Sequence, residues 1–66
     1  MQHVAYVGLG SNLGDAVSQV QRAITGLGEL PQTSVVAHSS LYRSAPVGYL
    51  DQPDFVNAVV RLETQL

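Results

Sequence analysis

The sequence contains no cysteine and no lysine, and each absence removes a class of structure or function. Without cysteine the chain forms neither disulfides nor thiolate metal sites, which often stabilise small domains. Its basic side chains, apart from two histidines, are Arg22, Arg43 and Arg61. Nucleic acid is excluded as a partner, because its recognition needs a basic face that neutralises several phosphates. Three scattered arginines are also too few to meet the charge of a nucleoside triphosphate alone.

Charge of either sign is scarce. Only 12% of the 66 residues are charged and 45% are hydrophobic, whereas about a quarter of the residues in an ordinary domain are charged. A chain of this length makes at most one small domain, and so few charges leave apolar surface uncovered unless something packs on it. We therefore expect residues 1–66 to form a single partial domain that self-associates or packs against a missing C-terminal portion.

Long hydrophobic runs are absent too. The apolar run Val4–Leu9 is too short to span a bilayer or to form the hydrophobic part of a signal peptide. No basic cluster precedes it. The sequence therefore predicts a cytoplasmic location and no membrane partner.

The first half of the chain predicts a strand followed by a helix. Val4–Leu9 is β-rich and apolar on both alternating faces, which favours a strand buried on both sides. A turn-rich stretch, Gly10–Asp15, follows it, and Asp15 is a good N-cap. Apolar residues at helical spacing then predict a helix over Ala16–Leu27, which Gly28 ends.

The second half predicts two more strands. Thr33–Tyr42 is rich in Val, Ser and Thr and favours one long strand, and Ser44–Asp54 is a loop by its proline and glycine content. Phe55–Thr64 alternates apolar and polar residues with a period of two. The order β-α-β-β predicts an α+β fold that begins a ferredoxin-like sandwich with a mainly antiparallel sheet. One helix covers one sheet face only, so we expect the chain to be truncated.

The glycines after the first strand suggest a nucleotide loop, but their spacing does not fit one. A dinucleotide fingerprint needs Gly-x-Gly-x-x-Gly, and after Gly8 and Gly10 the third glycine, Gly14, comes one residue late. A P-loop needs a lysine, and the chain has none. A tight strand-to-helix turn capped by Asp15 is the favoured interpretation over a phosphate cradle.

Phe55 and Asn57 are the most informative pair in the predicted third strand. Being two residues apart, they share the face opposite the apolar row. A ring beside a carboxamide suits a flat heterocycle, which stacks on the ring while the amide pairs with its polar edge. A core Phe beside an Asn that satisfies loop backbone is an equally good interpretation of the residues alone.

Three blocks of the sequence resemble the start of the 6-hydroxymethyl-7,8-dihydropterin pyrophosphokinases. They are Val4-Ala5-Tyr6 with Gly10–Asp15, then Ser40–Gly48, then Asp51–Ala58, and together they extend over essentially the whole chain. The resemblance implies a folate-pathway enzyme that moves the β,γ-pyrophosphoryl group of ATP to the pterin hydroxymethyl oxygen and leaves AMP. It also implies a ferredoxin-like fold, two magnesium ions and mobile loops over the site.

Carried over by position, the resemblance implies a pterin slot in this chain. Asn57 would bind the polar edge of the pterin and Phe55 would stack on its ring. Backbone groups around Ser44, Ala45 and Val47 would complete the slot. The segment containing Gly10, Ser11, Asn12 and Gly14 would be a mobile loop near the site.

The resemblance places the metal-binding Asp-x-Asp pair and the ATP-binding arginines later in the chain than Leu66. We therefore predict no catalytic residue and no metal ligand here, with Mg2+ and ATP held mainly by residues absent from this chain. Asp51 and Asp54 are interpreted as turn residues. Tyr6, Tyr42 and a partly buried His38 are interpreted as strand residues, and Arg43 as a surface residue.

A second hypothesis belongs to a different class. The charge-poor composition and the two-faced first strand also suit a non-catalytic small α+β module that associates through its open sheet face. Pterin binding separates the hypotheses, because only the pyrophosphokinase hypothesis requires it. Either way, the isolated chain is expected to have negligible transferase activity.

Overall fold

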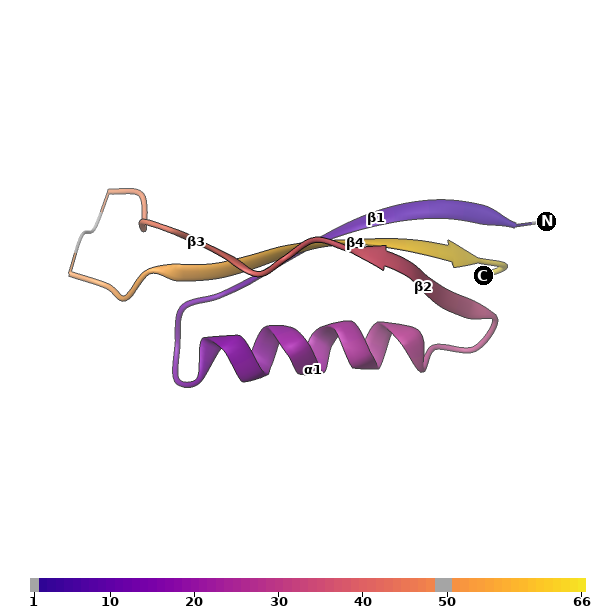
Figure 1. Ribbon diagram of the computed structural model, residues 1–66, viewed down its shortest axis with the longest axis horizontal. Helices are drawn as coiled ribbons and strands as arrows, with labels where there is room; N and C mark the ends of the chain where they lie inside the picture. Colours follow the sequence, from indigo (N-terminus) through magenta and orange to yellow (C-terminus); the bar gives the residue numbers. More distant parts are fainter. Residues whose placement is uncertain (1, 49–50) are drawn as a thin grey trace.

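The computed structural model describes residues 2–48 and 51–66, which form one sheet with one helix beside it (Figure 1). The elements are β1 (His3–Ser11), α1 (Ala16–Gly28), β2 (Thr33–His38), β3 (Tyr42–Ser44) and β4 (Phe55–Thr64). β4 is the central strand and pairs with β1 on one side and with β2 and β3 in succession on the other. All three pairings are antiparallel, which confirms the α+β class and the predicted start of a ferredoxin-like sheet.

The core lies between α1 and one face of β4. Every second residue of β4 from Val56 to Leu62 points to the helix and is at least 95% buried, namely Val56, Ala58, Val60 and Leu62. Val20 is the buried residue of α1 and packs against this row. Period-two alternation on the central strand meets the apolar stripe of the helix, as the sequence pattern predicted.

A local hydrogen bond fixes the start of α1. The Asp15 carboxylate accepts a hydrogen bond from the Ser18 backbone N–H at 3.2 Å, which confirms Asp15 as the N-cap. The same bond holds the pKa of Asp15 below its ordinary value, because it stabilises the ionised carboxylate. The helix ends at Gly28, and the Glu29 N–H donates to the Gly26 carbonyl at 3.1 Å.

The prediction of one long strand over Thr33–Tyr42 is wrong. The register against β4 shifts between Val35 and Ala37, and the chain then leaves the ladder until it pairs again at Tyr42. The Ser39 N–H donates to the Val59 carbonyl, while the Val59 N–H donates to the Ser39 side-chain hydroxyl at 2.8 Å. The Ser39 hydroxyl thus takes the place of a backbone carbonyl as the acceptor for Val59. This interrupts the ladder and divides the predicted strand into β2 and β3.

Two expectations for the first strand are also corrected. β1 extends from His3 to Ser11, so Gly10 and Ser11 belong to the strand and only 12–15 connect it to α1. The strand is not buried on both sides, because Val4 is 52% exposed and Tyr6 is 70% exposed. Figure 1 shows α1 along one face of the sheet, with no described element on the other. We call this other face the open face; its residues include Tyr6, Gly10, Asn57, Val59 and Arg61.

Candidate functional site

Four of the predicted site residues meet at one end of the open face. In the antiparallel ladders, Asn57 of β4 lies opposite Gly10 of β1 and Tyr42 of β3, and Phe55 lies opposite Ser44. Directly opposed residues project from the same face of a sheet. The strand register therefore brings Ser44, Phe55 and Asn57 together, with the backbone of Gly10 beside them.

A hydrogen bond fixes the Asn57 carboxamide. Asn57 Nδ2 donates to Ser44 Oγ at 2.7 Å. A primary amide has two N–H donors and a carbonyl acceptor, so one N–H and Oδ1 remain for a ligand. Asn57 is half-buried, which limits competition from water for those two groups. The arrangement offers an adjacent donor and acceptor beside the ring of Phe55.

Position 10 requires glycine because the β1 backbone passes close to the Asn57 side-chain amide. A Cβ placed on Gly10 would lie only 3.1 Å from Asn57 Oδ1, tighter than ordinary van der Waals contact. The sequence predicted Gly10 in a mobile loop near the site, whereas it lies in β1 beside Asn57. A glycine inside a strand indicates that another group approaches the backbone closely. Only the β1–β4 register shows that this group is Asn57.

The connection between β3 and β4 holds the other two predicted slot residues. Ala45 is exposed and the Val47 side chain is 99% exposed, so neither side chain is packed against Asn57. Their predicted contribution was through backbone groups, and it stays a prediction. Pro46 between them is buried and anchors this end of the connection. Tyr49 and Leu50, which no prediction assigned to the site, lie outside the described residues.

The loop before α1 reaches the same connection. Asn12 Nδ2 donates to Gln52 Oε1 at 3.2 Å and to the Pro53 carbonyl at 3.4 Å. A hollow of about 310 Å³ lies beside these bonds, lined by residues of both segments and of α1, β3 and β4. Its charged lining residues are Asp15, Arg43 and Asp54. Sequence reasoning had not linked the two loops, because they are some forty residues apart in the chain.

No cluster suited to a metal ion occurs in residues 2–48 and 51–66, because no three His, Asp or Glu side chains gather there. Asp51 and Asp54 are both exposed, as expected of turn residues. Asp54 nevertheless lines the hollow beside Asn12, together with Arg43. In the same part of the chain, no helix is long and apolar enough to cross a membrane.

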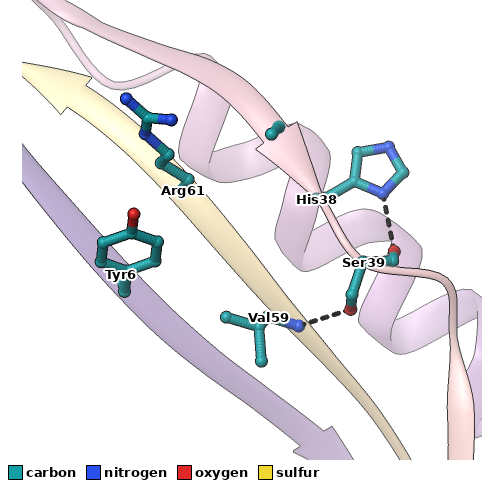
Figure 2. A pocket seen from close by; sticks show the side chains of 6 residues that line it. Tyr6, His38, Ser39, Val59 and Arg61 are labelled. Carbon is teal, nitrogen blue, oxygen red and sulfur yellow. Dashed lines mark hydrogen bonds between the residues drawn. The ribbon is translucent and has the colours of Figure 1, made fainter.

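A separate cavity of about 210 Å³ lies farther along the open face (Figure 2). It is lined by residues of β1, β4, the end of β2 and the residue after β2, namely Tyr6, Ala37, His38, Ser39, Val59 and Arg61. Figure 2 shows the His38 ring turned toward the Ser39 carbonyl, to which Nδ1 lies at 2.9 Å. His38 is exposed, so its predicted partial burial is wrong. Tyr6 and Tyr42 are strand residues as predicted, and both are at least half exposed.

The sequence of the chain is similar to those of known proteins. The family model for 7,8-dihydro-6-hydroxymethylpterin-pyrophosphokinase matches residues 6–66. The chain belongs to this family. It is 48% identical over 62 residues to the 2-amino-4-hydroxy-6-hydroxymethyldihydropteridine pyrophosphokinase of Haemophilus influenzae, covering 94% of this chain and 39% of that protein. The identically named protein of Pseudomonas aeruginosa is 51% identical over 61 residues, covering 92% and 38%.

A more distant member of the pyrophosphokinase family, from Bacillus subtilis, is 39% identical over all 66 residues and is covered to 40% of its length. The chain thus spans about two fifths of the length of these relatives. Family membership confirms the resemblance drawn from the three sequence blocks. The roles assigned to Ser44, Ala45, Val47, Phe55 and Asn57 stay predictions.

Proposed function

We propose that this chain supplies the pterin-binding surface of a pyrophosphokinase in folate biosynthesis. The observation that carries the proposal is the Asn57 carboxamide, held by Ser44 at 2.7 Å and placed on the same face as Phe55. A pterin ring is flat and carries neighbouring donors and acceptors along one edge. Asn57 Oδ1 accepts from a ring N–H and its free N–H donates to a ring acceptor, while Phe55 stacks on the ring.

The reaction proposed for the whole enzyme is transfer of pyrophosphate from ATP to 6-hydroxymethyl-7,8-dihydropterin. The hydroxymethyl oxygen bonds to the β-phosphorus, the bond from that phosphorus to the α,β-bridging oxygen breaks, and AMP leaves. The hydroxyl proton passes to solvent. Orientation of the hydroxyl is the contribution that a pterin slot makes, because transfer requires the attacking and leaving oxygens roughly in line.

ATP and magnesium are proposed ligands of the whole enzyme, and magnesium there would neutralise phosphate charge. The described residues do not fit magnesium, since no carboxylate cluster gathers among them, and no step is derived through it. The role of this chain is to bind and orient the pterin. Its cytoplasmic location is proposed on the same basis, as the setting of a biosynthetic enzyme.

Calorimetric titration of the chain with 6-hydroxymethylpterin tests the proposal. We expect saturable binding that Asn57→Ala weakens by about tenfold, because the variant loses a partly desolvated donor and acceptor. Val59→Ala is the matched control, since Val59 lies on the same strand and face and is 40% exposed. Flat heats for the unchanged chain, or equal affinity in the Asn57→Ala variant, would reject a pterin slot here.

A second candidate function is association with another protein chain through the open face. The exposure of Val4, Tyr6 and Val59 favours it, since all three are at least 40% exposed and lie on that face. The two candidates are distinguished by ligand, because pterin binding requires Asn57 and association requires the apolar side chains farther along the face.

A further inference from the structure

Asn12 joins two loops that border the proposed pterin slot. Its Nδ2 donates to Gln52 Oε1 at 3.2 Å and to the Pro53 carbonyl at 3.4 Å. Asn12 comes directly after β1, and Gln52 and Pro53 come shortly before β4. The strand register places Gly10 opposite Asn57 at the start of one segment, and Phe55 begins β4 at the end of the other. Each segment is therefore continuous with a residue of the proposed site.

The described residues of the β3–β4 connection have little other polar support from one another. Between the described residues, 45–48 and 51–54 make no hydrogen bond outside the strand ladders except those from Asn12. Backbone pairing stops at Ser44 opposite Phe55, so residues 45–48 and 51–54 belong to no described strand ladder. A hydrogen bond that holds part of a loop in one conformation lowers the entropy that a ligand must oppose when it binds there.

We infer that Asn12 is a positioning residue that pre-orders the β3–β4 connection for pterin binding. The inference rests on the proposed function. Asn12 touches no pterin atom in this scheme. It holds Gln52 and Pro53 against the loop before α1, and this restricts where the chain enters β4 at Phe55. The hollow between the two loops is the space into which an unattached connection would move.

Asn12 is suited to this role because it lies outside the core. Both of its bonds are to loop residues and are exposed to solvent, whereas the buried row that holds the fold together is on β4 facing α1. Removing the amide should therefore disorder the connection and leave the folded domain intact. A residue with a purely structural role would instead lower stability together with affinity.

A double-mutant cycle on the full chain tests the inference, with 6-hydroxymethylpterin as the probe. Asn12→Ala should weaken binding about three- to tenfold, as expected for loss of hydrogen bonds with a net value near the usual range. Gln52→Ala should weaken it less, because the bond to the Pro53 carbonyl remains. Gln52→Ala should weaken binding little further in the Asn12→Ala background, because both substitutions remove the same Asn12–Gln52 hydrogen bond. Leu13→Ala is the control, since Leu13 is in the same loop and 71% exposed.

A spectroscopic signature separates positioning from stability. In the ligand-free Asn12→Ala variant, the backbone amide signals of Asp51, Gln52 and Asp54 should move toward random-coil values. Amides of β4 should keep their positions, and the thermal midpoint should stay within about 2 °C of the unchanged chain. A variant that melts much earlier and loses β4 signals as well would overturn the positioning role.

The binding outcomes are distinguishable from failure of the proposed function. If the unchanged chain binds no pterin, both the proposed function and the role of Asn12 are overturned. If the unchanged chain binds and Asn12→Ala binds equally well, the pterin slot stands and the inference alone fails. Strictly additive effects of the two substitutions would also overturn it, because Asn12 would then not act through Gln52.

Discussion

At the scale of single residues, the candidate site is a carboxamide fixed from two sides. Ser44 Oγ accepts a hydrogen bond from Asn57 Nδ2. Gly10 has no Cβ and therefore leaves room for Asn57 Oδ1. An unattached amide would rotate and present either its oxygen or its nitrogen to a ligand edge. The Ser44 bond removes that ambiguity, so we expect Gly10 and Ser44 to influence pterin recognition through Asn57.

Gly10→Ala should weaken pterin binding by about tenfold, because a Cβ only 3.1 Å from Asn57 Oδ1 forces the carboxamide away from its position. The measurement is the dissociation constant of 6-hydroxymethylpterin. Gly8→Ala is the matched control. Gly8 is on the same strand and face, and a Cβ there meets nothing within 4 Å. Equal affinities for the two alanine variants would show that the Gly10–Asn57 contact has no part in recognition.

At the scale of elements, α1 is fixed by its N-cap and by one buried face. The cap is local, since Asp15 and Ser18 are three residues apart, and it orients the helix start immediately after the 12–15 loop. The face is set by Val20 against β4. The cap therefore links the stability of the helix to the protonation state of one exposed carboxylate.

Asp15 should make a part of the stability depend on acid pH. The hydrogen bond from the Ser18 N–H lowers the pKa of Asp15 from its ordinary value, so the folded state favours the ionised form. This contribution is fully present above the unfolded carboxyl pKa of about 3.9 and is lost as the pH falls through the lower folded pKa. Asn is also a good N-cap but does not titrate, which makes Asp15→Asn the comparison.

Urea unfolding of the unchanged chain and of Asp15→Asn, from pH 2 to pH 7, measures the effect. The stability difference between the two should be constant above about pH 5 and should shift against the unchanged chain below about pH 4. Asp15→Ala should lower the midpoint of thermal unfolding at neutral pH by about 4–8 °C. A stability difference that does not vary with pH would show that the ionised carboxylate is not what caps α1.

At the scale of the whole molecule, one helix covers one face of the sheet and leaves the other open among the described residues. Tyr6 is 70% exposed, Val4 52% and Val59 40%, and the first two belong to a strand with a free edge. Apolar sheet faces and free strand edges favour association.

The chain should self-associate at high concentration through this face, and Tyr6→Ser should weaken the association at least about tenfold, because burial of a large aromatic side chain is lost. Sedimentation equilibrium measures it against the chain mass of 7.0 kDa. Val47→Ser is the control, because Val47 is 99% exposed but lies in the β3–β4 connection. A monomer of 7.0 kDa at millimolar concentration would contradict self-association through the open face.

The sequence by itself determined what depends on neighbours along the chain. Asp15 as the cap, the helix after it, and the strand Phe55–Thr64 all follow from residues a few positions apart. The face shared by Phe55 and Asn57 follows from the period of a strand, and the three sequence blocks identified the family. In each case the physical cause is local, either a short-range hydrogen bond or a fixed repeat of side-chain direction.

Only the tertiary structure decided what depends on pairing between distant segments. The division of Thr33–Tyr42 arises from the register against β4 and from the Ser39 hydroxyl. The contact of Gly10 with Asn57 and the bonds from Asn12 to Gln52 and Pro53 join residues forty or more positions apart. A sequence pattern specifies which face a residue occupies but not which strand will lie opposite it, because register is set by the packing of the whole sheet.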